Sequence, residues 1–145
     1  MKFNILIVII FCLVGLFTSN DSLANDIYNL DKNLFISDTT LDNAPATIVY
    51  LGGDDNNYCS VTINEEIFSQ PTGAIENSKR NNESVLSVNC QIGNSYYVIS
   101  SKHKTIASIQ WATDEISGKK SLRFNADLVT PKGKSLSFAA NNIVL

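Results

Sequence analysis

The densest group of oxygen ligands in the chain lies in YLGGDDNNYCSVTIN, residues 50–64, where two aspartates and two asparagines follow two glycines. Carboxylate and amide oxygens are the ligands that calcium prefers. An EF-type loop beginning at Asp54 would, however, place Tyr58 at its fifth position and Cys59 where a glycine is needed. Residues 58–63 also alternate like a strand. We therefore interpret the stretch as a turn between two strands and expect no metal site there.

Other residues with catalytic potential are few and poorly placed. The single histidine, His103, lies between Lys102 and Lys104 in a segment that suits a solvated turn more than a general base. Adjacent carboxylates such as Glu65 and Glu66 would point to opposite faces of a strand and could not act as one acid–base pair. No nucleophile elbow, zinc-binding histidine pair, phosphate-binding glycine loop or dinucleotide fingerprint occurs. We expect a protein that is not an enzyme and that uses no cofactor.

Residues 1–24 have the pattern of a secretory signal peptide. One basic residue, Lys2, precedes an apolar run at about 5–17, and the segment ends in the small-x-small sequence Ser22-Leu23-Ala24. The run is shorter than the roughly 20 residues that a membrane-spanning helix needs. The sequence therefore predicts cleavage after Ala24, no membrane span afterwards, and a single β domain at 25–145 that is exported to the periplasm, the cell surface or the medium.

Removal of the signal peptide would take Cys12 with it and leave two cysteines, Cys59 and Cys90. In an oxidising compartment two remaining cysteines predict one disulfide bond. A zinc site would need further cysteine or histidine ligands, and a redox site would need the two cysteines two residues apart. Neither pattern occurs, so a structural Cys59–Cys90 bridge is expected.

The sequence after the signal peptide predicts short strands separated by turns. In residues 84–92, Leu86, Val88, Cys90 and Ile92 alternate with polar residues, which is typical of a strand with one buried face. Gly93-Asn94 then predicts a tight hairpin. Similar patterns predict further strands, which gives the set 47–51, 58–63, 84–92, 95–101, 104–112, 121–129 and 135–140. The fold class expected is all-β, a small antiparallel β-sandwich or barrel of about six to seven strands with one disulfide.

Charge is divided unevenly along the chain. Residues 25–76 carry nine acidic side chains and one basic one, a net charge of −8, whereas 77–145 carry nine basic and four acidic ones, a net charge of +5. If the two halves interleave in one sheet system, neighbouring strands neutralise each other. If they do not, the molecule presents opposite poles to a partner or to its own copies. An acidic exported protein is a poor candidate for binding nucleic acid.

Whether Tyr97 and Trp111 belong to a binding surface depends on which residues of their strands face the core. If Val98 and Ile106 face the core, then Tyr97 and Trp111 point outward, near the cations Lys102 and Lys104. Exposed tyrosine and tryptophan are typical anchors of binding surfaces, so these four residues form the binding surface that the sequence predicts. The alternative is that Trp111 belongs to the core and Ile106 does not.

The function that these patterns favour is that of an exported, non-enzymatic binding or assembly module, such as an adhesion, fimbrial or secretion accessory protein. Its partner would be a protein or a glycan, and the prediction leaves a homo-oligomer open. Two alternatives remain at this point. One is a carbohydrate- or receptor-binding subunit of a secreted complex, and the other is a secreted enzyme inhibitor.

Overall fold

The structure is a computed structural model that describes residues 27–29, 33–78 and 84–145. The predicted signal peptide lies outside these residues. Ten strands and one short 3₁₀ helix form in the described part of the chain. They are β1 (Ile27–Asn29), β2 (Asn33–Leu41), β3 (Ala44–Asp54), β4 (Asn57–Asn64), η1 (Glu65–Ser69), β5 (Thr72–Asn77), β6 (Leu86–Ile92), β7 (Ser95–Val98), β8 (Ile106–Thr113), β9 (Lys120–Val129) and β10 (Ser135–Val144).

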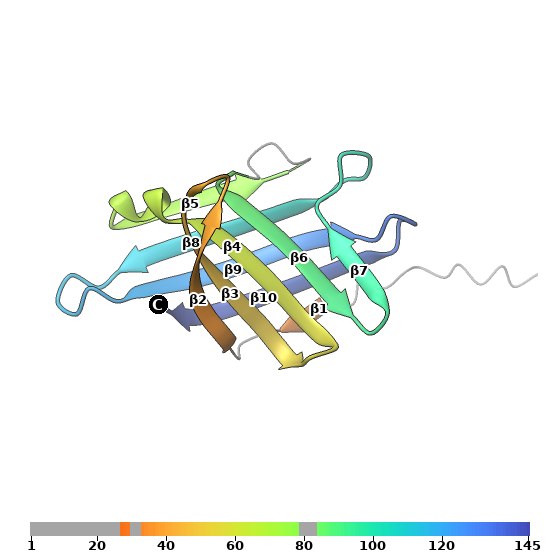
Figure 1. Ribbon diagram of the computed structural model, residues 1–145, viewed down its shortest axis with the longest axis horizontal. Coiled ribbons are helices and arrows are strands. Elements are labelled where there is room, and N and C mark those ends of the chain that lie inside the picture. Colours follow the sequence, from red (N-terminus) through yellow and green to blue (C-terminus); the bar gives the residue numbers. More distant parts are fainter. Residues whose placement is uncertain (1–26, 30–32, 79–83) are drawn as a thin grey trace, which may run out of the picture.

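All ten strands belong to one open sheet that is folded into two layers (Figure 1). The first layer has the strand order β2-β3-β4-β6-β7, and the second has the order β5-β8-β9-β10-β1. A single residue pair, Val98 with Val129, joins β7 of the first layer to β9 of the second. Figure 1 shows the strands of the two layers crossing one another. The pairing is antiparallel except between β1 and β10.

The prediction of an all-β, antiparallel fold with one disulfide is confirmed. The predicted count of six to seven strands is too low, because β1, β2 and β5 were not expected. The short helix η1 was also not expected. It begins after Asn64, whose side-chain oxygen accepts a hydrogen bond from the backbone N–H of Glu66, as at an N-cap.

The core lies between the layers and is built from alternating residues of both. Most of the inward positions predicted for residues 84–92, 121–129 and 135–140 are buried, namely Leu86, Val88, Cys90, Leu122, Phe124, Ala126, Leu128, Leu136 and Phe138. Ile92, also predicted to face inward, is half-buried and packs against the same core. The buried side chains share one cluster with inward residues of β3, β4, β7 and β8. This burial is the main source of stability for both layers.

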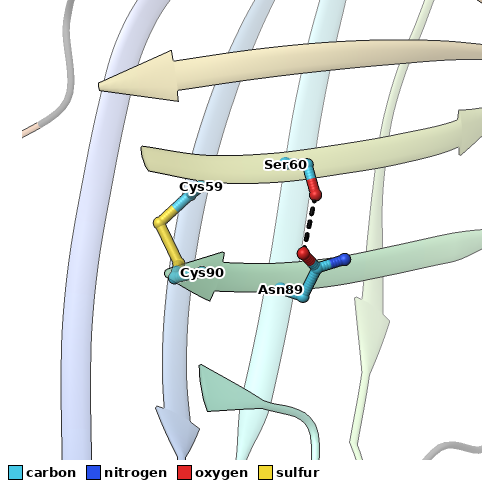
Figure 2. The surroundings of a disulfide bond; sticks show 4 residues. All are labelled: Cys59, Ser60, Asn89 and Cys90. Carbon is cyan, nitrogen blue, oxygen red and sulfur yellow. Dashed lines mark hydrogen bonds between the residues drawn. A yellow bond between two sulfur atoms is a disulfide. The ribbon is translucent and has the colours of Figure 1, made fainter. Parts of the chain in front are cut away.

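The disulfide joins Cys59 of β4 to Cys90 of β6, as predicted (Figure 2). The two cysteines are directly opposite one another in the strand register, and both are fully buried. At the next position of the same two strands, the Ser60 hydroxyl donates a 2.8 Å hydrogen bond to Oδ1 of Asn89. Because side chains alternate along a strand, this polar pair faces away from the core.

The acidic stretch at residues 50–64 forms a hairpin, as predicted. β3 continues to Asp54 and β4 begins at Asn57, so only two residues form the turn between them. Gly52 has a φ of +146°, and a methyl group there would lie 2.4 Å from the carbonyl oxygen of Asn57, so glycine is required. The carbonyl oxygen of Asn56 accepts a 2.8 Å hydrogen bond from the backbone N–H of Gly93. This contact ties the turn to the neighbouring β6–β7 turn.

Candidate functional site

The expectation that Tyr97 and Trp111 are exposed is wrong. Tyr97 is 2% exposed and Trp111 is 7% exposed, because the inward positions of their segments are Ile99 and Ile109 rather than Val98 and Ile106. The alternative, in which Trp111 belongs to the core, is the one that the structure shows. Both rings therefore pack in the interior and cannot be anchors of a binding surface.

Trp111 is held from several sides. Its indole Nε1 donates a 3.0 Å hydrogen bond to the carbonyl oxygen of Gln70, and the ring of Phe68 meets it edge-on at a centroid distance of 6.0 Å. A methyl group at Gly73 would lie only 2.2 Å from the indole. The indole thus lies against the backbone of β5, which explains why a glycine stands at that position.

Lys102 and Lys104 are exposed, as the sequence predicted, on a loop whose backbone is held by its own side chains. The hydroxyl oxygen of Ser100 accepts hydrogen bonds from the N–H groups of Lys102 and His103, at 3.0 and 3.1 Å. The hydroxyl of Thr105, which is buried, accepts from the N–H of Ser100 and donates to its carbonyl oxygen. These bonds fix the segment that carries the three adjacent side chains Lys102, His103 and Lys104.

A second basic loop, between β9 and β10, touches the first. The backbone N–H and carbonyl of buried Thr130 bond to Lys134 and Gly133 respectively, and its hydroxyl accepts from the N–H of Lys134 at 3.1 Å. A methyl group at Gly133 would lie 3.6 Å from Cε1 of His103, so the two loops are in contact. Lys132 and Lys134 therefore join the cations of the first loop at one end of the molecule.

The first loop and the adjoining ends of β9 and β10 border a cleft of about 860 Å³, which we call the basic cleft. The first loop supplies three basic side chains to its lining, and the outward positions of the second layer supply hydroxyl groups and two carboxylates. Among its lining residues are Lys102, His103, Lys104, Ser101, Ser135, Ser137, Glu76 and Asp127. Asp127 Oδ1 accepts a short hydrogen bond from the hydroxyl of Ser137. The arrangement can bind an anion beside neutral hydrogen-bond donors.

A second candidate surface, which we call the aromatic face, is the outward face of the first layer around Phe35, Tyr50, Tyr58 and Tyr96. The strand register places these side chains on the side away from the core, because their neighbours in sequence, such as Leu51, Cys59 and Tyr97, point into it. The other outward positions of β4, β6 and β7 hold Ser60, Thr62, Asn64, Ser87, Asn89, Gln91 and Val98. No side chain is charged at the described outward strand positions of this face, although Asp55 of the β3–β4 turn lies at its border.

Three rings form a line across three strands of the aromatic face. Phe35 of β2 and Tyr50 of β3 have centroids 6.0 Å apart, and Tyr50 and Tyr58 of β4 have centroids 5.9 Å apart. The planes are tilted by 39° and 57°, and the rings border a shallow hollow of about 270 Å³ together with Asp55. Phe35 is 56% exposed, so the line is open to solvent.

The register extends the aromatic face beyond the three rings. Tyr58 is opposite Gln91 of β6, and Gln91 is opposite Tyr96 of β7, which is 51% exposed. Tyr96 thus lies two strand spacings from Tyr58, or about 10 Å. An amide side chain occupies the position between the two rings, so apolar and hydrogen-bonding groups alternate across the sheet.

The sequence contained a signal for the aromatic face. Tyr50 lies next to Leu51 in β3, where Val49 and Leu51 point inward. Tyr58 lies next to Cys59 in β4, where Cys59 and Val61 point inward. An aromatic residue out of phase with such a buried set must point outward. Phe35 carried no comparable signal, because β2 has no buried side chain among its described residues to fix a phase.

Neither surface has the ligands of a metal centre. Within the described residues no three histidine, cysteine, aspartate or glutamate side chains lie close enough to hold an ion. No helix in the same part of the chain is long and apolar enough to cross a membrane.

The fold and the two surfaces define an all-β protein with a disulfide-linked, two-layer sheet. Comparison with protein-family models, curated proteins and solved structures gave no match. Its function is therefore argued from the aromatic face and the basic cleft.

Proposed function

We propose that the protein is an exported, non-enzymatic binding module that recognises a neutral glycan through the aromatic face. The observation that carries the proposal is the line of Phe35, Tyr50 and Tyr58 on a sheet face whose described outward strand positions hold no charged side chain. Tyrosine combines an apolar ring with a hydroxyl that hydrogen-bonds, so it suits a ligand with both kinds of surface.

The chemistry of a neutral sugar matches that of the face. The carbon–hydrogen surface of a sugar ring can stack on an aromatic ring, while its hydroxyl groups need donors and acceptors nearby. Gln91 and Asn89 offer amides, and the carboxylate of Asp55 borders the hollow. A charged ligand would find no ion partner on the strands themselves. A small number of polar groups around an apolar surface is the usual composition of a ligand site.

Export and a role in adhesion are part of the same proposal. The buried Cys59–Cys90 disulfide is compatible with an oxidising compartment, where such bonds persist. The predicted signal peptide supports the same destination. A glycan-binding module at a cell surface or in the medium would work by attachment and would need no catalytic group.

The proposal is tested by isothermal titration of the mature protein with neutral oligosaccharides of glucan, xylan, mannan and galactan type. At least one should bind with an affinity that changes little with salt. Tyr58→Ala and Phe35→Ala should each weaken binding about fivefold, since a lost ring contact is worth about 1 kcal/mol. Ile116→Ala, at a 98% exposed apolar residue in the β8–β9 turn, is the matched control and should bind normally.

Two results would count against the proposal. One is that no neutral glycan binds while the protein copurifies with a protein target, as an inhibitor or an assembly component would. The other is binding that the ring variants leave unchanged. Size-exclusion chromatography separates these alternatives, because an assembly component should elute as an oligomer and an inhibitor as a monomer.

A further inference from the structure

We infer that the basic cleft is a second ligand site, separate from the aromatic face, and that it binds an acidic saccharide through a carboxylate group. The cleft lies on the outward face of the second layer, at the end where the two basic loops meet. The aromatic face belongs to the first layer. The inference therefore does not depend on the function proposed for the aromatic face.

The cations of the cleft are presented by a backbone that is already ordered. Ser100 and Thr105 hold the first loop with four hydrogen bonds of 2.9–3.3 Å. Binding an anion therefore costs little loop entropy, and the side chains of Lys102 and Lys104 need only to settle on the ligand. The loop carries three consecutive basic side chains with no acidic residue among them, so it offers several donors that can bind the carboxylate of a ligand.

The second loop strengthens the positive potential at the same end. Lys132 and Lys134 flank Gly133, the residue that touches His103. Lys102 and Lys104 line the cleft, whereas Lys132 and Lys134 lie on the neighbouring loop, with Nζ of Lys134 5.9 Å from the centroid of the Tyr97 ring, in a protein with a net charge of −3. A local excess of positive charge in an acidic protein attracts anions to one place rather than to the whole surface.

Two carboxylates in the lining of the cleft restrict which anions can bind. Asp127 lies in one row with Ile106 and Ser137 across β8, β9 and β10, and Glu76 lines the cleft from β5. Carboxylates accept hydrogen bonds and repel other anions. A ligand that satisfies both the lysines and the carboxylates must therefore carry an anionic group together with neutral hydrogen-bond donors. A sugar acid has a carboxylate and several hydroxyl groups, whereas a continuous polyanion would be repelled by Asp127 and Glu76.

The size of the cleft fits such a ligand. A volume of about 860 Å³ lies in the upper part of the range of 300–1,000 Å³ that is typical of small-molecule sites. The hydroxyl groups of Ser101, Ser135 and Ser137 provide further donors and acceptors along it. The cleft can therefore hold a short oligosaccharide and is larger than a single inorganic anion needs.

The experiment is a titration of the mature protein with two oligosaccharides that each carry one carboxylate, sialyllactose and a xylotriose bearing a single glucuronate, each compared with its methyl ester and with inorganic phosphate. At least one acid should bind at about 50 mM salt and bind more weakly at about 300 mM, because screening reduces attraction between exposed charges. The ester should bind at least tenfold more weakly, and phosphate should not compete. The comparison of acid with ester needs no variant.

Variants locate the site. Lys102→Gln combined with Lys104→Gln should weaken binding of the acid about tenfold or more, because charge-assisted hydrogen bonds are lost. Lys119→Gln combined with Arg123→Gln removes the same charge from exposed positions that do not line the cleft, and it should change affinity less than twofold. Equal binding of acid and ester, competition by phosphate, an equal loss in the two double variants, or no binding of either acid would overturn the inference.

Discussion

At the residue scale, Asp114 shows how one side chain organises a turn. It begins the β8–β9 connection, where its Oδ1 accepts hydrogen bonds from the backbone N–H groups of Ser117 and Ile116 at 2.7 and 2.9 Å. Its backbone closes the turn with Lys119 and Gly118, and Gly118 has a φ of +71°. The hydrogen bonds from Ser117, and then that from Ile116, hold the pKa of Asp114 below its ordinary value of 3.8.

This shift predicts a pH-dependent contribution to stability. A folded-state pKa below the unfolded one means that ionised Asp114 stabilises the protein above about pH 4, and that this contribution is lost as the pH falls through the folded pKa. The difference in melting temperature between the wild type and Asp114→Asn should be constant from neutral pH to about pH 5 and should shrink at lower pH. Glu115→Gln, in the same turn, is the control. A difference that grows on acidification would contradict the argument.

The phase of the aromatic residues was ambiguous in the sequence for a physical reason. Tyr96, Tyr97, Val98 and Ile99 are four consecutive apolar or aromatic residues, so alternation cannot show which of them face inward. Tertiary packing decides the matter, since Tyr97 and Ile99 are buried and Tyr96 is exposed. Where polar residues alternate with apolar ones, as from Leu122 to Leu128, the sequence was sufficient to predict which residues face inward.

At the element scale, the strands that the sequence predicted are those with one buried and one solvated face. β2 did not show such a pattern, because each of its described side chains is exposed or half-buried and β3 is the strand that it pairs with in the described part of the chain. β5 was hidden because its inward positions are Gly73, Ile75 and Asn77, and the first of these is covered by the Trp111 ring. The hairpin between β2 and β3 uses Asp42 and Asn43, both at positive φ.

The disulfide between β4 and β6 is predicted to contribute to the stability of the fold. The Cys59–Cys90 bridge closes a loop with a sequence separation of 31 between directly opposite residues. Replacing both cysteines by alanine should lower the free energy of unfolding by about 2 to 5 kcal/mol, measured by urea denaturation. Reduction of the wild type should produce a similar loss. Protein from its native compartment should give the bridged peptide in mass spectrometry, and two alkylatable thiols there would contradict the prediction.

At the scale of the whole molecule, the two halves of the chain interleave. β4 of the acidic half pairs with β6 of the basic half, and β5 pairs with β8 in the second layer. This is the backbone arrangement in which acidic and basic side chains on neighbouring strands neutralise each other. The basic side chains of two loops nevertheless gather at one end, because β7–β8 and β9–β10 connect at the same corner of the sheet. Sequence order alone could not show this, since the contact joins residues about 30 positions apart.

The two layers are held together at two corners, and one of them depends on a buried polar side chain. At the first corner, Val98 pairs with Val129. Near the second, Asn77 at the end of β5 is fully buried and its Nδ2 donates a 2.7 Å hydrogen bond to the carbonyl oxygen of Leu86, the first residue of β6. This bond links β5 of the second layer to β6 of the first, the next strand along the chain.

Replacing Asn77 should therefore weaken the contact between the layers. Asn77→Leu keeps a similar volume but cannot donate, so the carbonyl of Leu86 loses a buried partner, and the free energy of unfolding should fall by about 1 to 3 kcal/mol. Ser60→Ala removes a hydrogen bond that lies within one layer, and it should cost about 1 kcal/mol or less. Urea denaturation measures both, and hydrogen exchange of β5 separates local from global loosening. If Asn77→Leu were no more destabilising than Ser60→Ala, the packing between the layers would not depend on this bond.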